Sequence, residues 1–114
     1  MKTLVSLIRP ENFEQEVVGE KKPVLLLCMH RDEEFPNQLK LIEAIASKYS
    51  DELKVGLLEE EFIEAFKKNY GVIGTPTFLL LIEGKERGRV LGLTDTETLT
   101  DLVSQSLLIT DVLQ

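Results

Sequence analysis

The stretch Gly74-Thr75-Pro76-Thr77-Phe78-Leu79-Leu80-Leu81-Ile82 decides the fold of this chain. Its last five residues form an uninterrupted apolar run, which predicts a strand. Pro76 stands just before this run, and proline has no amide hydrogen to donate to a strand ladder. It therefore belongs at the start of the strand or in a special bend, often with a cis peptide bond. A bend at this place indicates that the residues around Pro76 form one side of a candidate functional site.

The residues upstream predict alternating strands and helices. Val24 to Met29 is a second apolar run without polar alternation, so we expect it to be a central strand. Apolar residues recur every three or four positions from about Glu34 to Tyr49, which predicts an amphipathic helix. Lys54 to Leu58 is a third strand, and a short helix follows from Glu60 to Asn69.

The two ends of the chain complete the pattern. Lys2 to Ile8 is an expected edge strand, and Pro10 suits the first turn of a helix that ends at Gly19. Downstream of the Pro76 run, Glu83 to Glu86 predicts a hairpin connection to an antiparallel strand from Arg87 to Leu93. Thr94-x-x-Glu97 reads as a capping box that opens the last helix. The sequence therefore predicts an α/β fold with a mixed central sheet and helices on both faces.

Length and charge limit the functions that this chain can have. With 114 residues, 43% of them hydrophobic, residues 1–114 are expected to form a single domain. A net charge of −7 disfavours nucleic acid and anionic membrane surfaces as partners and favours basic or neutral proteins. The longest apolar runs are far shorter than the roughly 20 residues of a membrane span. The N-terminal run is broken by Arg9-Pro10, which makes it a poor signal peptide, so a cytoplasmic protein is expected.

The order of these elements resembles thioredoxin, from about Phe13 to Leu108. The residues that match the scaffold of that family are Tyr70-Gly71-Val72, Gly74, Pro76, Gly84 and Gly92. The resemblance implies a thioredoxin fold with a cis bond between Thr75 and Pro76. It also implies a groove in which the backbone before the proline pairs with an extended polypeptide, as in strand addition.

The redox residues of that family are missing from this chain. The two positions of the Cys-x-x-Cys motif hold Asp32 and Phe35, the buried acid of the family corresponds to Leu26, and its lysine partner corresponds to Leu57. The resemblance therefore implies a protein without dithiol chemistry and without a cofactor. The segment Gly84 to Leu93 also resembles hydrogenase-maturation chaperones, which include thioredoxin-like proteins that lack both cysteines.

The resemblance places the candidate polypeptide-binding groove at eight residues, Arg31, Asp32, Glu33, Glu34, Phe35, Thr75, Pro76 and Gly92. Each part has a structural alternative. The three acids either complement the start of a helix or form an acidic lip that recruits a basic segment. Phe35 either packs the helix or forms an apolar floor for a bound peptide. Pro76 either is required only by the fold or forms part of a groove that binds a polypeptide.

Two further candidates concern a metal and a thiol. His30 adjoins the three acids, but no spacing here matches a known set of metal ligands, so we expect no metal site. Cys28 is the only cysteine, and it is either a small core residue or a reactive thiol.

These observations predict a redox-inactive thioredoxin-like protein that binds a polypeptide client or partner protein, as an accessory or chaperone-like module. The first alternative is an oxidoreductase that forms a mixed disulfide through Cys28. The second is a structural subunit whose groove stays empty.

Overall fold

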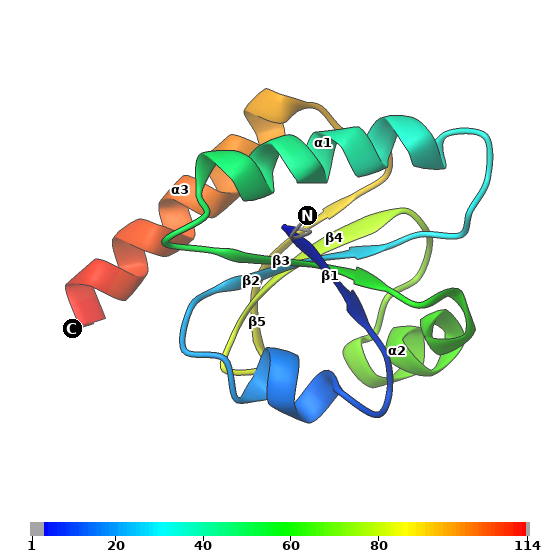
Figure 1. The fold of residues 1–114 in the computed structure, drawn as a ribbon, viewed down its shortest axis with the longest axis horizontal. Coiled ribbons are helices and arrows are strands. Elements are labelled where there is room, and N and C mark those ends of the chain that lie inside the picture. The colour runs from blue at the N-terminus through cyan, green and yellow to red at the C-terminus, as the bar shows by residue number, and fades with distance from the viewer. Residues whose placement is uncertain (1–3, 114) are drawn as a thin grey trace.

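The computed structural model describes residues 4–113, and for residues 109–113 it describes the backbone alone. A five-stranded sheet forms the centre of the molecule (Figure 1). In spatial order its strands are β1 (Val5–Ile8), β3 (Lys54–Leu58), β2 (Val24–Cys28), β4 (Thr77–Ile82) and β5 (Lys85–Leu91). The first three strands of this order are parallel, whereas β4 runs antiparallel to β2 and β5 antiparallel to β4. The predicted mixed sheet of an α/β protein is confirmed.

Helices cover both faces of this sheet, as the sequence predicts (Figure 1). On one face lie α1 (Phe35–Lys48) and α3 (Thr96–Leu113). On the other face lie the π-helical η1 (Glu14–Val18), the 3-10 helix η2 (Glu60–Phe62) and α2 (Ile63–Tyr70). A separate cluster of buried apolar side chains fills each of the two layers between helices and sheet.

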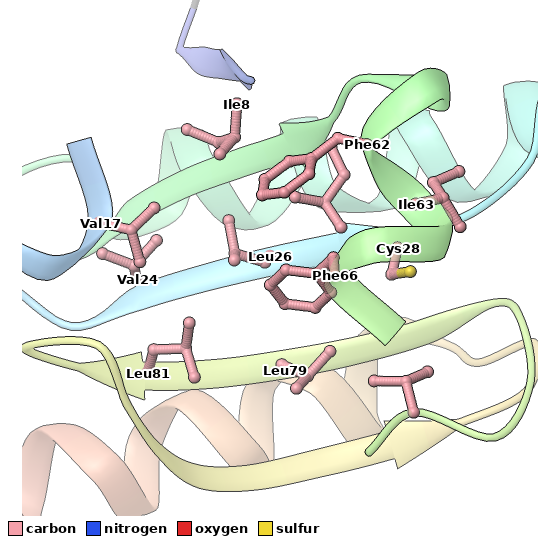
Figure 2. Close-up of a cluster of buried hydrophobic side chains, with 12 residues drawn as sticks. Ile8, Val17, Val24, Leu26, Cys28, Phe62, Ile63, Phe66, Leu79 and Leu81 are labelled. Carbon is pink, nitrogen blue, oxygen red and sulfur yellow. The ribbon is translucent and has the colours of Figure 1, made fainter. Parts of the chain in front are cut away.

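Strand β2 is central, and all five of its residues are completely buried. Successive side chains of a strand point to opposite faces. Leu25 and Leu27 accordingly enter the cluster under α1 and α3, whereas Leu26 and Cys28 enter the cluster under α2. Figure 2 shows this second cluster, where Phe66 lies over the sheet. Because both faces of β2 are covered by helices, apolar side chains are favoured at every position of this strand.

The connection between β4 and β5 is shorter than the sequence predicts. Strand β5 starts at Lys85, so only Glu83 and Gly84 form the turn, and the expected four-residue connection is wrong. Both turn residues have positive φ, 51° and 80°, which is the backbone conformation whose twist matches that of a two-residue hairpin. Tyr70 holds this turn by donating a hydrogen bond from its hydroxyl to the carbonyl of Gly84 at 2.8 Å.

The predicted starts of two helices are also wrong. The last helix is capped by Asp95, whose Oδ1 accepts the amide hydrogen of Thr98 at 2.9 Å. The backbone of Thr94 instead exchanges two hydrogen bonds with the side chain of Gln38 on α1. Near the N-terminus, Pro10 lies in a turn that the side chain of Asn12 closes onto the amide of Arg9, and regular helix begins only after this turn.

Candidate functional site

The candidate residues predicted from the sequence meet at one end of the sheet. Cys28, the last residue of β2, is opposite Thr77, and Thr77 is in turn opposite Leu91 at the end of β5. The loop after β2, the proline before β4 and the glycine after β5 therefore share this end. The amide of Gly92 donates to the carbonyl of Pro76 at 2.8 Å, which joins two of these segments directly.

The Thr75–Pro76 peptide bond is cis. The hydroxyl of Thr77 donates to the carbonyl of Gly74 at 2.7 Å and closes the bend around the proline. Thr75 itself is half-buried, and no residue in the described part of the chain forms a hydrogen bond with its backbone. The N–H and C=O groups of Thr75 therefore have no hydrogen-bond partner within the described residues.

Gly92 lies on the other side of Pro76 with a φ of 94°. This is a backbone conformation that L-residues with a side chain rarely adopt. A Cβ atom at this position would have no neighbour within 4 Å, so space does not demand the glycine. The conformation of the turn out of β5 demands it.

Arg31 holds the loop after β2 in place. Its guanidinium donates to the carbonyls of Met29 and Leu58, both at 2.8 Å, which are at the ends of two neighbouring strands. It also lies 4.8 Å from the ring centroid of Phe35. Phe35 packs against the cluster under α1, which supports its helix-packing role more than that of an open floor. Through these contacts, Arg31 fixes the loop after β2 to the adjacent ends of β2 and β3.

The three acids of this loop are exposed at the start of α1. Asp32 accepts the amide hydrogen of Glu34 at 3.0 Å, and the N-cap residue Glu34 makes no side-chain cap bond. None of the described cations forms an ion pair with Asp32, Glu33 or Glu34. Their negative charge therefore faces solvent.

Gln38 connects this start of α1 to the segment after β5. The side chain of Gln38 is buried, and its amide group exchanges two hydrogen bonds with the backbone of Thr94, at 3.2 and 3.3 Å. The Gln38 amide group both donates to and accepts from the Thr94 backbone, as the backbone of a residue in a neighbouring strand would. Glu34 lies one helical turn before Gln38, and Leu93 directly precedes Thr94. The two hydrogen bonds therefore place Glu34 on the same side of the molecule as Leu93.

Sequence reasoning missed three exposed aliphatic residues at this end. The exposed fractions are 85% for Ile73, 56% for Leu91 and 55% for Leu93. A Cβ atom on Gly74 would be 3.8 Å from Leu91 Cδ1, so Ile73 and Leu91 belong to adjacent segments. We use the term Pro76 face for Ile73, Pro76, Leu91, Gly92 and Leu93. No local sequence signal identified these residues, because an apolar residue in or next to a strand is ordinarily expected to be buried.

Cys28 lies below this end, inside the cluster under α2 (Figure 2). Its side chain is completely buried. The pKa of the Cys28 thiol is raised to about 11, chiefly by burial; Glu64 contributes to the increase, while Lys67 and Arg31 oppose it. A thiol of this kind is protonated at neutral pH and is shielded from a partner disulfide.

His30 lies on the surface beside η2 and α2. Its two ring nitrogens are each 3.7 Å from a carboxylate oxygen, of Glu60 and of Glu64. Within the part of the chain that the structure describes, no three His, Cys, Asp or Glu residues are placed to hold a metal ion together. No described helix combines the length and the apolar character that crossing a membrane requires.

A scan against models of known protein families finds no match to this chain, and a search of curated proteins finds no significant relative.

Proposed function

We propose that this protein is a thioredoxin-like module that binds an extended polypeptide segment at the Pro76 face without redox chemistry. The observation that carries the proposal is the unpaired backbone of Thr75 beside the cis proline, at the point where β4 begins. Strand addition needs such free main-chain groups for affinity and nearby side-chain contacts for selection. Ile73, Leu91 and Leu93 would supply the apolar contacts.

The thioredoxin fold is part of this proposal. Its support is the order of helices and strands along the chain together with the position of Pro76 at the start of β4. The absence of thiols at positions 32 and 35 supports a binding role over disulfide exchange, since exchange needs an attacking and a resolving thiol. An accessory or chaperone-like role for a polypeptide client follows from these features.

The alternative, an oxidoreductase that works through Cys28 alone, has less support. Mixed-disulfide formation requires an accessible thiolate, whereas this thiol is buried and has a raised pKa. Such a reaction would first require the cluster under α2 to open.

An array of random 12-residue peptides tests the proposal. Labelled protein is expected to bind a subset of the peptides, and Leu91→Glu should abolish this binding because it places a charge in the apolar contact. Leu108→Glu is the matched control, since Leu108 is 66% exposed but lies on α3 outside the Pro76 face. Binding that Leu91→Glu leaves intact, or an array on which nothing binds, would overturn the proposal.

A further inference from the structure

The Pro76 face exposes apolar side chains, and acids that form no ion pair with a described cation lie beside it. Among the described residues, six large hydrophobic side chains are exposed, and three of them are Ile73, Leu91 and Leu93. Exposed apolar patches with polar rims are a feature of interaction sites.

Negative charge borders this patch on the side of α1. The pair of hydrogen bonds between Gln38 and Thr94 holds the first turn of α1 against the segment that carries Leu93. Glu34 lies one turn before Gln38, and Glu33 precedes it. Glu34 is therefore close in space to the segment that carries Leu93, although the two residues are 59 positions apart in sequence.

No described basic side chain forms an ion pair with these acids. The guanidinium of Arg31 donates to the carbonyls of Met29 and Leu58 and lies against the ring of Phe35. Lys67, another cation at this end of the sheet, pairs with Glu64 on α2. The whole chain carries a net charge of −7, so this rim repels acidic chains, including a second copy of the same protein.

We infer that the occupant of the Pro76 face is an extended segment in which an aliphatic residue is followed closely by lysine or arginine. The aliphatic side chain contacts Ile73, Leu91 and Leu93, and the cation lies near Glu33 and Glu34. This inference rests on the proposed function and adds the chemistry of the partner. Charge at the rim of an interface contributes selectivity and speeds association, whereas the apolar contact contributes most of the binding free energy.

Three fluorescent ten-residue peptides test the inference. All share a background of serine and threonine, which suits an extended chain. The first carries one leucine followed by two lysines, the second replaces both lysines by glutamate, and the third replaces the leucine by serine. Fluorescence anisotropy at low salt is expected to give the first peptide an affinity about tenfold higher than either of the others. Raising the salt concentration should weaken the advantage over the glutamate peptide more than that over the serine peptide.

Protein variants separate the two contributions. The double variant Glu33→Gln and Glu34→Gln should reduce the discrimination between lysine and glutamate peptides while preserving the preference for leucine. Leu108→Glu adds an acid elsewhere and should change neither preference. Circular dichroism and urea unfolding check that each variant is folded.

Several results would overturn the inference. These are equal affinities for the lysine and glutamate peptides, no binding of any of the three, or a dimer that forms through this face and is broken by Leu91→Glu. The proposed function fails separately, on the random array. If array peptides bind in a manner that depends on Leu91 but show no preference for basic residues, the function stands and only the partner chemistry is wrong.

Discussion

The thiol of Cys28 should react far more slowly in the folded protein than in the unfolded chain. Burial raises its pKa from 9.0 to about 11, which lowers the thiolate population at neutral pH about 100-fold. Access adds a further factor, because the side chain is completely buried and core segments open only at a free energy close to that of global unfolding. Together these terms predict a native labelling rate at least about 1,000-fold below the unfolded rate.

Stopped-flow labelling with a chromogenic disulfide reagent at pH 7 measures this rate, with and without urea. A variant that combines Cys28→Ala with Ser50→Cys is the control, because Ser50 is exposed and its replacement should react at the same rate in both conditions. If native Cys28 reacted within tenfold of the unfolded chain, the account of a shielded thiol would be refuted. The oxidoreductase alternative would then gain support.

The same pKa shift predicts how stability depends on pH. The folded-state pKa lies above the unfolded value, so the contribution of Cys28 is fully present below pH 9 and is lost as pH rises toward 11. The loss amounts to about 3 kcal/mol for a shift of this size. Urea unfolding of wild type and Cys28→Ala between pH 8 and 11 should show the stability difference shrinking as pH rises. Parallel curves would contradict the prediction.

Three other expectations concern residues that shape the site and its surroundings. Gly92→Ala should lower the free energy of unfolding in urea by about 1–2 kcal/mol because φ is 94°, whereas Gly74→Ala, which meets only an ordinary contact, should cost less. Hydrogen bonds from Arg89 lower the pKa of Glu86, so the stability from this pair is present above pH 4.5 and lost as pH falls through the folded pKa. Urea midpoints of wild type and Glu86→Gln should therefore converge in acid, because this change removes the titrating group and leaves the Arg89 bonds to the carbonyls of Tyr70 and Gly71 in place. Asp95→Ala should lower the thermal midpoint more than Asp95→Asn at neutral pH, since only asparagine retains the acceptor for the amide at the start of α3.

Much of the candidate site could be predicted, but through the resemblance to thioredoxin rather than from local signals alone. Local signals placed Pro76 at the start of an apolar strand and Gly92 near the end of the next strand. The resemblance then joined Thr75, Pro76, Gly92 and the loop from Arg31 to Phe35 into one groove. The exposed aliphatic residues could not be found in this way, since apolar residues next to a strand are expected to be buried.

The sequence by itself determined the elements whose patterns repeat along the chain. The uninterrupted apolar runs of β2 and β4 and the three- to four-residue spacing of α1 depend only on which side chains must leave water. Only the tertiary structure decided the roles of residues whose partners are distant. Gln38 pairs with Thr94, which is 56 positions away, and Arg31 reaches Leu58 across 27 positions. Local patterns could not assign these partners to Gln38 and Arg31, because the backbone groups that satisfy their hydrogen bonds come within reach only in the folded chain.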